Sequence, residues 1–282
     1  QELDIVSIVK PVTKYAVMVT KPEEIRYHLD RAVYEATTGR KGPVWLDLPL
    51  DIQAMQVDEE SLTGWQLETA DAQDVQAADA ALEHQVLKII DELNHASRPV
   101  LLAGNGIRLA EAIPEFEKLV DELGIPVLTT WNGIDLIGED HPLFFGRPGG
   151  MGQRYANFVQ QNSDFFLSIG ARMNLLQTGY NFDGFAREAV KVMVDIDENE
   201  LHKINVRLQI AVCADAKAFI RCMLKHADRI EKRDHSEWIA YARRMKEKYP
   251  VVLKKYWEQQ DEVNTYALLD VITEQMSDND IY

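Results

Sequence analysis

The sequence predicts an α/β protein built on a doubly wound parallel sheet. Short apolar segments of strand length alternate with stretches in which apolar residues recur at helical spacing. The expected strands are 99–103, 125–130, 165–169, 190–195 and 210–212. The helices expected around them are 76–95, 108–123, 152–161, 198–204 and 215–226. Apolar strands separated by helices are typical of parallel sheets whose two faces are both covered.

The segments before this sheet are less complete. Residues 22–37 predict a helix and 43–49 a strand, which is the pattern of the end of another α/β domain, because one strand alone has no sheet to join. The stretch 51–74 contains seven acidic residues and no Lys or Arg, so a solvated linker is expected. The predicted parts are a domain end at 1–53, a linker at 54–75, a central domain at 76–228 and a mainly helical part at 229–282.

The C-terminal part predicts a helical extension in two pieces. The first helix presents one apolar face, formed by Trp238, Ala242, Met245 and Tyr249. The second is expected after Asn264, an N-cap candidate, with its apolar side chains facing inward. Those inward side chains are Leu268, Leu269, Ile272 and Met276. A turn at 278–280 and the first step of a strand at 281–282 follow.

Composition excludes several classes of function. The chain of 282 residues has 46 acidic and 30 basic residues, a net charge of −16, which repels phosphate backbones and disfavours a nucleic-acid partner. There is no apolar run of ~18 residues, so no membrane span is expected. Cys213 and Cys222 have no metal or redox spacing, so a reduced, cytoplasmic compartment is expected. Gln1 in place of Met predicts a piece cut from a longer protein.

The strongest local signal is the turn Gly104-Asn105-Gly106, which joins a predicted strand to a predicted helix. Two glycines let the backbone approach a phosphate, and free N–H groups at a helix start favour an anion. Leu109 occupies the place of a third glycine, and Thr129-Thr130 rather than an acidic residue ends the next strand, which disfavours a standard NAD site. The turn is explained as well by a plain tight connection as by a ligand loop.

Polar residues or glycines also follow the other predicted strands. They lie at 129–133, 170–174, 195–197 and 214–215, and the glycine-rich stretch 149–152 precedes a helix. The carboxyl ends of parallel strands meet at one edge, where such sheets bind ligands, so a nucleotide-like ligand is favoured there over a merely structural edge.

Other kinds of site find less support. The acidic run 195–200 has Glu200 where a calcium loop requires glycine, and a capping box with Asp197 as N-cap and Glu200 at N3 explains it better. Arg172 is suited either to a phosphate or to pairing with a neighbouring carboxylate. No zinc-hydrolase spacing and no Gly-x-Ser-x-Gly elbow occur, so no metal site is predicted.

An ordered set of motifs then identifies a family. The motifs are Lys10-Pro11-Val12-Thr13-Lys14, the stretch 38–44, Pro49-Leu50-Asp51-Ile52-Gln53, the Gly104–Gly106 turn, Val127-Leu128-Thr129-Thr130, Asp140-His141-Pro142, Gly170-Ala171-Arg172, Val194-Asp195-Ile196-Asp197 and the stretch 213–217. With them the chain resembles the thiamine diphosphate-dependent enzymes, acetolactate synthases above all, over nearly its whole length.

The resemblance implies a division of the chain and a chemistry. Residues 1–53 would be the end of the pyrimidine-binding domain, 76–228 the Rossmann-like central domain, and 229–282 the helical linker and start of the diphosphate-binding domain. The parent enzyme would decarboxylate a 2-keto acid and transfer the resulting unit, with thiamine diphosphate and Mg²⁺, as a homo-dimer or tetramer. The family's catalytic glutamate lies outside this chain and no Gly-Asp-Gly occurs in it, so the fragment alone is expected to be inactive.

The resemblance also implies a cofactor site in the central domain, for FAD or ADP. By this likeness the contacts fall on Gly104, Asn105, Gly106, Thr129, Thr130, Gly150, Met151, Gly152, Gly170, Arg172, Asp195, Ile196, Asp215 and Ala216. Two alternatives remain beside the enzyme fragment: a stand-alone nucleotide-binding module, and a non-catalytic structural subunit of the same fold.

Overall fold

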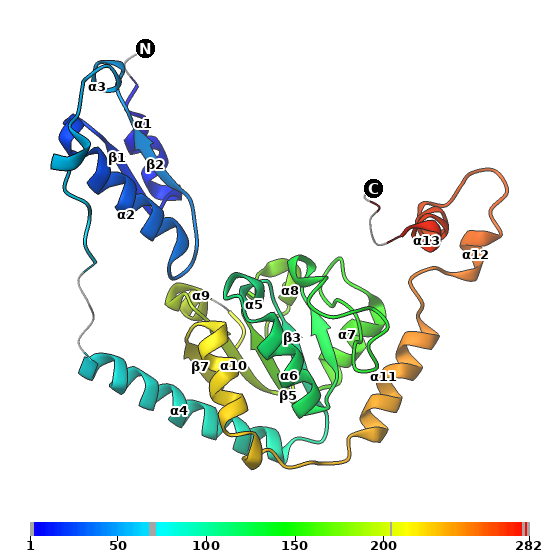
Figure 1. Cartoon of the computed structure of the whole chain (residues 1–282). Coiled ribbons are helices and arrows are strands. Elements are labelled where there is room, and N and C mark those ends of the chain that lie inside the picture. Colours follow the sequence, from blue (N-terminus) through cyan, green and yellow to red (C-terminus); the bar gives the residue numbers. More distant parts are fainter. Residues whose placement is uncertain (1–2, 68–71, 204, 278–279, 281–282) are drawn as a thin grey trace. The chain divides into compact units, whose positions relative to one another are not determined.

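The computed structural model in Figure 1 describes residues 3–67, 72–203, 205–277 and 280. The chain divides into two compact units, Gln1–Ala81 and Leu82–Tyr282. Within the described residues, no helix is long and apolar enough to span a bilayer.

The first unit is a small βαβ arrangement. Strands β1 (Tyr15–Met18) and β2 (Val44–Asp47) pair in parallel, and helix α2 (Ile25–Thr37) connects them. The short helices are α1 (Ile5–Val9) and α3 (Leu50–Gln53), and single 3-10 turns cover Lys10–Val12, Pro22–Glu24 and Glu59–Ser61. The expectation of a single strand in this region was wrong, because β1 is only four residues long and no glycine or proline stands directly beside it.

A lysine from the first unit's opening motif caps helix α2. The Lys14 ammonium donates to the carbonyl oxygen of Glu35 and, at 2.7 Å, to that of Thr38. The last carbonyls of a helix lack partners within the helix and carry partial negative charge, so a cation there is stabilising. The chain then leaves the helix through Gly39 at φ 56°. This contact joins the 10–14 motif to the start of the 38–44 stretch.

The second unit contains a five-stranded parallel sheet, which confirms the predicted fold class. The strands lie in the order β4-β3-β5-β6-β7. Their bounds are β3 Pro99–Ala103, β4 Val127–Thr129, β5 Phe165–Ile169, β6 Val190–Asp195 and β7 Ile210–Cys213. The strand order reverses between β3 and β5, the position at which doubly wound sheets bind ligands.

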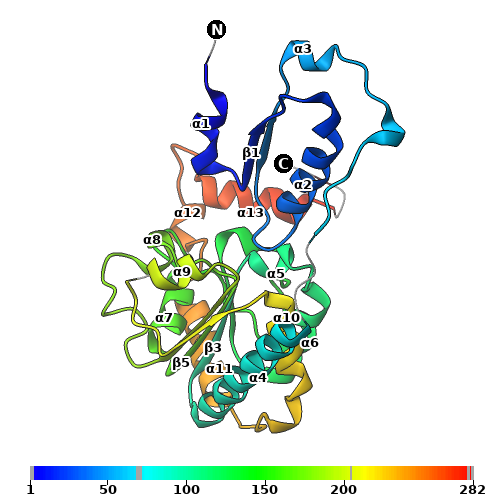
Figure 2. The ribbon, with the colours of Figure 1, turned by 90° about the vertical axis from the view of Figure 1, so that its left-hand side faces the viewer.

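Helices cover both faces of this sheet, as Figure 2 shows. On one face lie α4 (Ala72–His95), α6 (Ile113–Leu123) and α10 (Ala216–Lys225), packed on alternate strand residues such as Leu101 and Ala103. On the other lie α7 (Arg154–Asn162) and α11 (Ser236–Lys248), packed on Val100 and Leu102. Because side chains alternate along a strand, these short apolar strands serve two cores.

One predicted helix is interrupted. Residues 108–123 were expected to form a single helix, but the structure has α5 (Gly106–Leu109) and α6, separated by Glu111 in the left-handed region at φ 55°. Pro114 lies in the first turn of α6, where its missing N–H is harmless; inside a continuous helix it would cost a hydrogen bond. Gly124, the predicted cap, ends α6 at φ 60°.

The two C-terminal helices behave differently. Trp238 and Ala242 of α11 are buried, as predicted. Asn264 caps α13 (Thr265–Gln275) by accepting from the Tyr266 amide at 3.0 Å, which confirms that N-cap. The apolar side chains expected to face inward were predicted wrongly. Leu268, Leu269 and Ile272 are exposed, and Met276 follows the helix.

The reason is that α13 packs on α12 (Lys254–Trp257), a single helical turn that covers little of its surface. The turn predicted at 278–280 and the strand at 281–282 involve residues outside the described ranges. The remaining short helices are α8 (Leu175–Thr178) and α9 (Glu198–Lys203), with 3-10 turns at Trp131–Gly133 and Ala227–Arg229.

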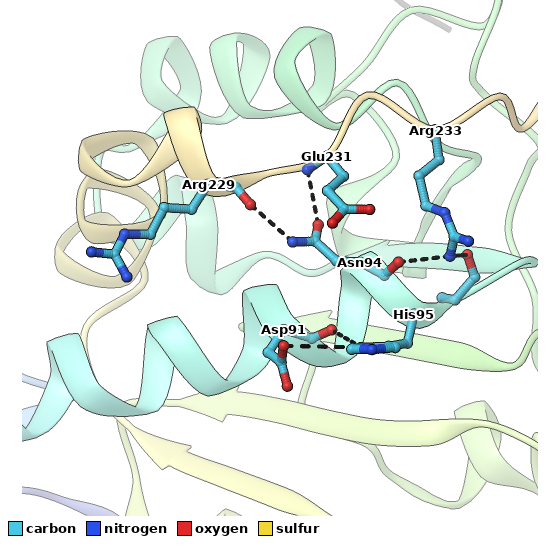
Figure 3. Close-up of polar contacts among 7 residues, drawn as sticks. Asp91, Asn94, His95, Arg229, Glu231 and Arg233 are labelled. Atoms are coloured by element: carbon cyan, nitrogen blue, oxygen red, sulfur yellow. Dashed lines mark hydrogen bonds and ion pairs between the residues drawn. The ribbon is translucent and has the colours of Figure 1, made fainter.

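A polar cluster joins the end of α4 to the segment that follows α10 (Figure 3). The side-chain amide of Asn94 donates to the Arg229 carbonyl at 2.8 Å and accepts from the Glu231 amide at 2.9 Å. The Arg233 guanidinium donates to the carbonyl oxygens of Asn94 and Ala96, at 2.6 and 3.3 Å. The Arg233 bond satisfies the Asn94 carbonyl, one of those that the end of α4 leaves without a helical partner.

Candidate functional site

The five parallel strands all end at one edge of the sheet, which we call the carboxyl edge. In the strand register Ala103 lies opposite both Thr129 and Ile169, Ile169 opposite Val194, and Asp195 opposite Cys213. The predicted site residues of the strand ends therefore lie along this edge. The 149–152 loop is tied to the segment after β5, because the Gly150 amide donates to the Leu176 carbonyl at 2.7 Å.

The glycines of the first turn bring two backbones into contact. A Cβ on Gly104 would lie 2.1 Å from the Gly170 carbonyl oxygen and 2.3 Å from the Cα of Ala171. A Cβ on Gly106 would lie 2.7 Å from the Cα of Gly170. Real Cβ contacts are not this short, so the glycines at 104, 106 and 170 are required for packing where the strand order reverses. This favours the tight-connection interpretation of the turn.

The amides of both glycines in this turn are also already used. Gly104 N donates to the Ile169 carbonyl at 2.9 Å, Gly106 N to the Gly170 carbonyl at 3.0 Å, and Ile107 N to the Gly104 carbonyl at 3.1 Å. In addition, α5 has only four residues, so its dipole is small. The sequence predicts free N–H groups at the start of a long helix, which would favour an anion. The Gly104 and Gly106 amides are therefore not free for an anion, and no long helix begins there.

Arg172 combines an uncommon backbone conformation with a buried partner. Its φ is 38°, in the left-handed region that L side chains rarely adopt. Its Nε lies 3.0 Å from Oε1 of Glu200, and Lys203 Nζ lies 2.5 Å from Oε2 of the same carboxylate. The Glu200 side chain is 5% exposed, whereas Arg172 and Lys203 are exposed at 58% and 51%. Glu200 therefore draws two cations to the carboxyl edge.

The three aspartates at this edge hold backbone amides. Asp195 Oδ1 accepts from the Asp197 amide at 3.0 Å, and Asp215 Oδ1 accepts from Lys217 and Ala218 at 2.9 and 3.1 Å. Asp197 accepts from the Asn199 amide at 3.0 Å, which agrees with its expected role as N-cap of α9. The Asp197 amide, which a capping box would pair with Glu200, donates to Asp195. Glu200 contributes its charge to the ion pairs.

Two further features of the edge become visible only in the structure, although Thr129 and Met151 are among the predicted positions. Thr129 is fully buried, and in the described chain its hydroxyl has no hydrogen-bond partner. Large apolar side chains on the edge loops are exposed: Trp131 at 73%, Met151 at 77%, Leu176 at 68% and Tyr180 at 85%. An exposed apolar rim is typical of a surface that another molecule covers.

Tyr155 lies just beyond the 149–152 loop and gives a pH prediction. Burial, reinforced by Glu139, raises the pKa of Tyr155 to about 12. The pKa of an unfolded tyrosine is near 10, so the folded state keeps the phenol proton to a higher pH than the unfolded state does. The protonated phenol therefore contributes its full stability below pH ~10, and this contribution is lost as the pH rises to ~12. We expect wild type to lose about 2 to 3 kcal/mol more than Tyr155→Phe over this range. Urea unfolding of both proteins near pH 9 and 12 measures it; parallel profiles would contradict it.

Comparisons with known proteins identify the family of the central part of the chain. Residues 86–223 match the family described as thiamine pyrophosphate enzyme, central domain. This part of the chain belongs to that family, and the likeness extends well beyond it. The chain is similar to acetolactate synthases, at 35% identity over 254 residues to the large subunit of Corynebacterium glutamicum.

Two other relatives agree. The probable acetolactate synthase large subunit of Methanocaldococcus jannaschii is 36% identical over 247 residues, and the mitochondrial catalytic subunit of Saccharomyces cerevisiae 32% over 262. The three alignments cover 89%, 85% and 89% of this chain, but 39%, 40% and 38% of the relatives. The chain thus spans about two fifths of their length.

Proposed function

We propose that this chain is the central part of an acetolactate synthase-like enzyme. In this proposal the whole protein decarboxylates a 2-keto acid with thiamine diphosphate and Mg²⁺, transfers the resulting unit, and works as a cytoplasmic homo-dimer or tetramer. The observation that carries it is the match to acetolactate synthases over 85–89% of the chain. The alternatives, a free-standing module or a structural subunit, have no comparable support.

The residues present in this chain do not fit a site for thiamine diphosphate itself. No Gly-Asp-Gly occurs in the sequence, and among the described residues no group of three or more His, Cys, Asp and Glu side chains could hold a metal ion. We therefore derive no catalytic step here. We expect the purified chain neither to bind thiamine diphosphate nor to consume pyruvate.

The carboxyl edge of the central domain fits a nucleotide such as FAD or ADP. Arg172 is the single cation among the fourteen predicted positions, so it would hold the phosphates in place of the Gly104–Gly106 amides. Asp195 and Asp215 stand where carboxylates accept from ribose hydroxyls. The exposed Met151 is suited to the ring system. A bound nucleotide would supply adenine, ribose and phosphate groups for these contacts.

Calorimetric titration of the whole chain tests both parts. We expect saturable binding of FAD or ADP, no heat from thiamine diphosphate with Mg²⁺, and no pyruvate loss. Titrations with FAD and ADP that show no saturable binding would reject the nucleotide site. Thiamine diphosphate binding at micromolar affinity would reject the assignment of that cofactor's site to other parts of the protein. Light scattering of the whole protein gives its oligomeric state, for which we expect a dimer or tetramer.

A further inference from the structure

Glu200 is a buried carboxylate at the carboxyl edge. The resemblance to the family assigns it no role. It projects from α9, the helix after β6, and is 4% exposed. Burying a charge costs free energy unless it is paired, and the pairing here uses Arg172 from the loop after β5. The ion pair thus links the segments that follow two adjacent strands of the sheet.

Arg172 has features of a side chain whose position matters. It lies two residues beyond Gly170, where the strand order reverses, and its φ of 38° carries strain that the surrounding structure must offset. Glu200 contacts it at Nε, and a guanidinium has four further N–H groups on its two Nη atoms. A carboxylate that fixes one nitrogen of an arginine restricts the remaining donors, which saves part of the entropy of ordering them on a ligand.

We propose that Glu200 is a positioning residue, which holds Arg172 for the phosphate groups of a nucleotide bound at the carboxyl edge. This inference rests on the proposed nucleotide site and assigns a role within it. It makes a specific claim about charge. Removing the Glu200 carboxylate makes the edge more positive and would by itself strengthen phosphate binding. If positioning dominates, binding weakens instead.

Lys203 provides a matched control. It pairs with the same carboxylate through Oε2, lies three positions from Glu200 on α9, and is 51% exposed. Replacing it removes a cation from the edge while the contact between Glu200 and Arg172 stays. A general electrostatic effect should therefore appear in Lys203→Gln, and a positioning effect should not.

The test is calorimetric titration of the whole chain with ADP and with adenosine, which lacks phosphate. We expect Glu200→Gln to weaken ADP binding about tenfold or more, and to leave adenosine binding unchanged. Arg172→Gln should do the same. The double variant should lose no more than Arg172→Gln alone, because the two residues act as one unit. Lys203→Gln should change ADP binding by less than about threefold.

Arg172→Lys keeps the buried carboxylate paired with a cation and serves if Glu200→Gln does not fold. It retains the charge and loses Nε, so we expect a similar loss of ADP affinity with adenosine unchanged. Unchanged or tighter ADP binding in a folded Glu200→Gln or Arg172→Lys would overturn the inference and leave the nucleotide site standing. A wild-type chain that binds neither FAD nor ADP would overturn both.

Discussion

Replacing Gly104 by alanine is expected to lower the free energy of unfolding by about 3 kcal/mol or more. The added Cβ would lie 2.1 Å from the Gly170 carbonyl oxygen and 2.3 Å from the Cα of Ala171. Both are backbone atoms that follow β5, so no side chain can rotate away and the two turns must separate. Overpacking a core with one methylene costs typically about 1 to 3 kcal/mol, and this clash is with backbone. Urea unfolding followed by circular dichroism measures the change.

Gly124→Ala is the matched control for this prediction. Gly124 has φ 60°, and a Cβ there would meet no atom within 4 Å. The same substitution then imposes only backbone strain, about 1 kcal/mol. Equal losses in the two variants would mean that the turns at Gly104 and Gly170 separate without cost. A Gly104→Ala protein of normal stability that no longer binds ADP would assign the glycine to a ligand instead.

Replacing Trp238 by alanine is expected to cost about 3 to 5 kcal/mol. The indole is 5% exposed, packs in the core that contains Val100 and Leu102, and stacks on Tyr241 at a centroid distance of 5.2 Å. Its Nε1 donates to the Pro99 carbonyl at 2.9 Å, at the start of β3. Trp238→Phe keeps an aromatic ring and leaves that buried carbonyl without its donor, for an expected loss of about 1 to 3 kcal/mol.

The exposed Trp131 is the control that separates the loss of a buried indole from the loss of any indole. Trp131→Ala removes an indole that is 73% exposed and should change stability by less than about 0.5 kcal/mol. The family match ends at residue 223, whereas α11 begins at Ser236. A small effect of Trp238→Ala would therefore show that α11 unfolds separately from the central domain. A large one shows that both belong to one cooperative unit.

Periodicity predicted the central sheet well, because its strands are short, apolar and bounded by helices with clear apolar faces. It failed where packing between segments decides whether a strand forms or a helix face is buried. Residues 15–18 become a strand through pairing with 44–47, which spacing along the chain does not reveal. The apolar face of 265–275 satisfies helical spacing and still lies exposed, because α12 covers little of it. Pro114 was the available signal for the break between α5 and α6.

The candidate site was also predictable only in part. Strand order placed the loops of the carboxyl edge together, since the ends of parallel strands must meet there. Spacing could not show which groups bond to which. The Gly104 and Gly106 amides have acceptors in the neighbouring strand end, and Arg172 is paired with Glu200. Glu200 was assigned to a cap, since the sequence places it three residues after Asp197 and says nothing of a cation from another strand.

The bonds around Asn94 have a consequence for the order in which the protein folds. Asn94 and Glu231 are 137 positions apart in the sequence. On a ribosome that adds ~5–20 residues per second, Glu231 is therefore made on the order of ten seconds after Asn94. Helix α4 is the first element of its unit to be made, and its last turn is completed only after β7 and α10 exist. Contacts that close so late add little to the folding rate and mainly slow unfolding. We therefore expect the Asn94 bonds to act mainly on the rate at which the folded domain unfolds.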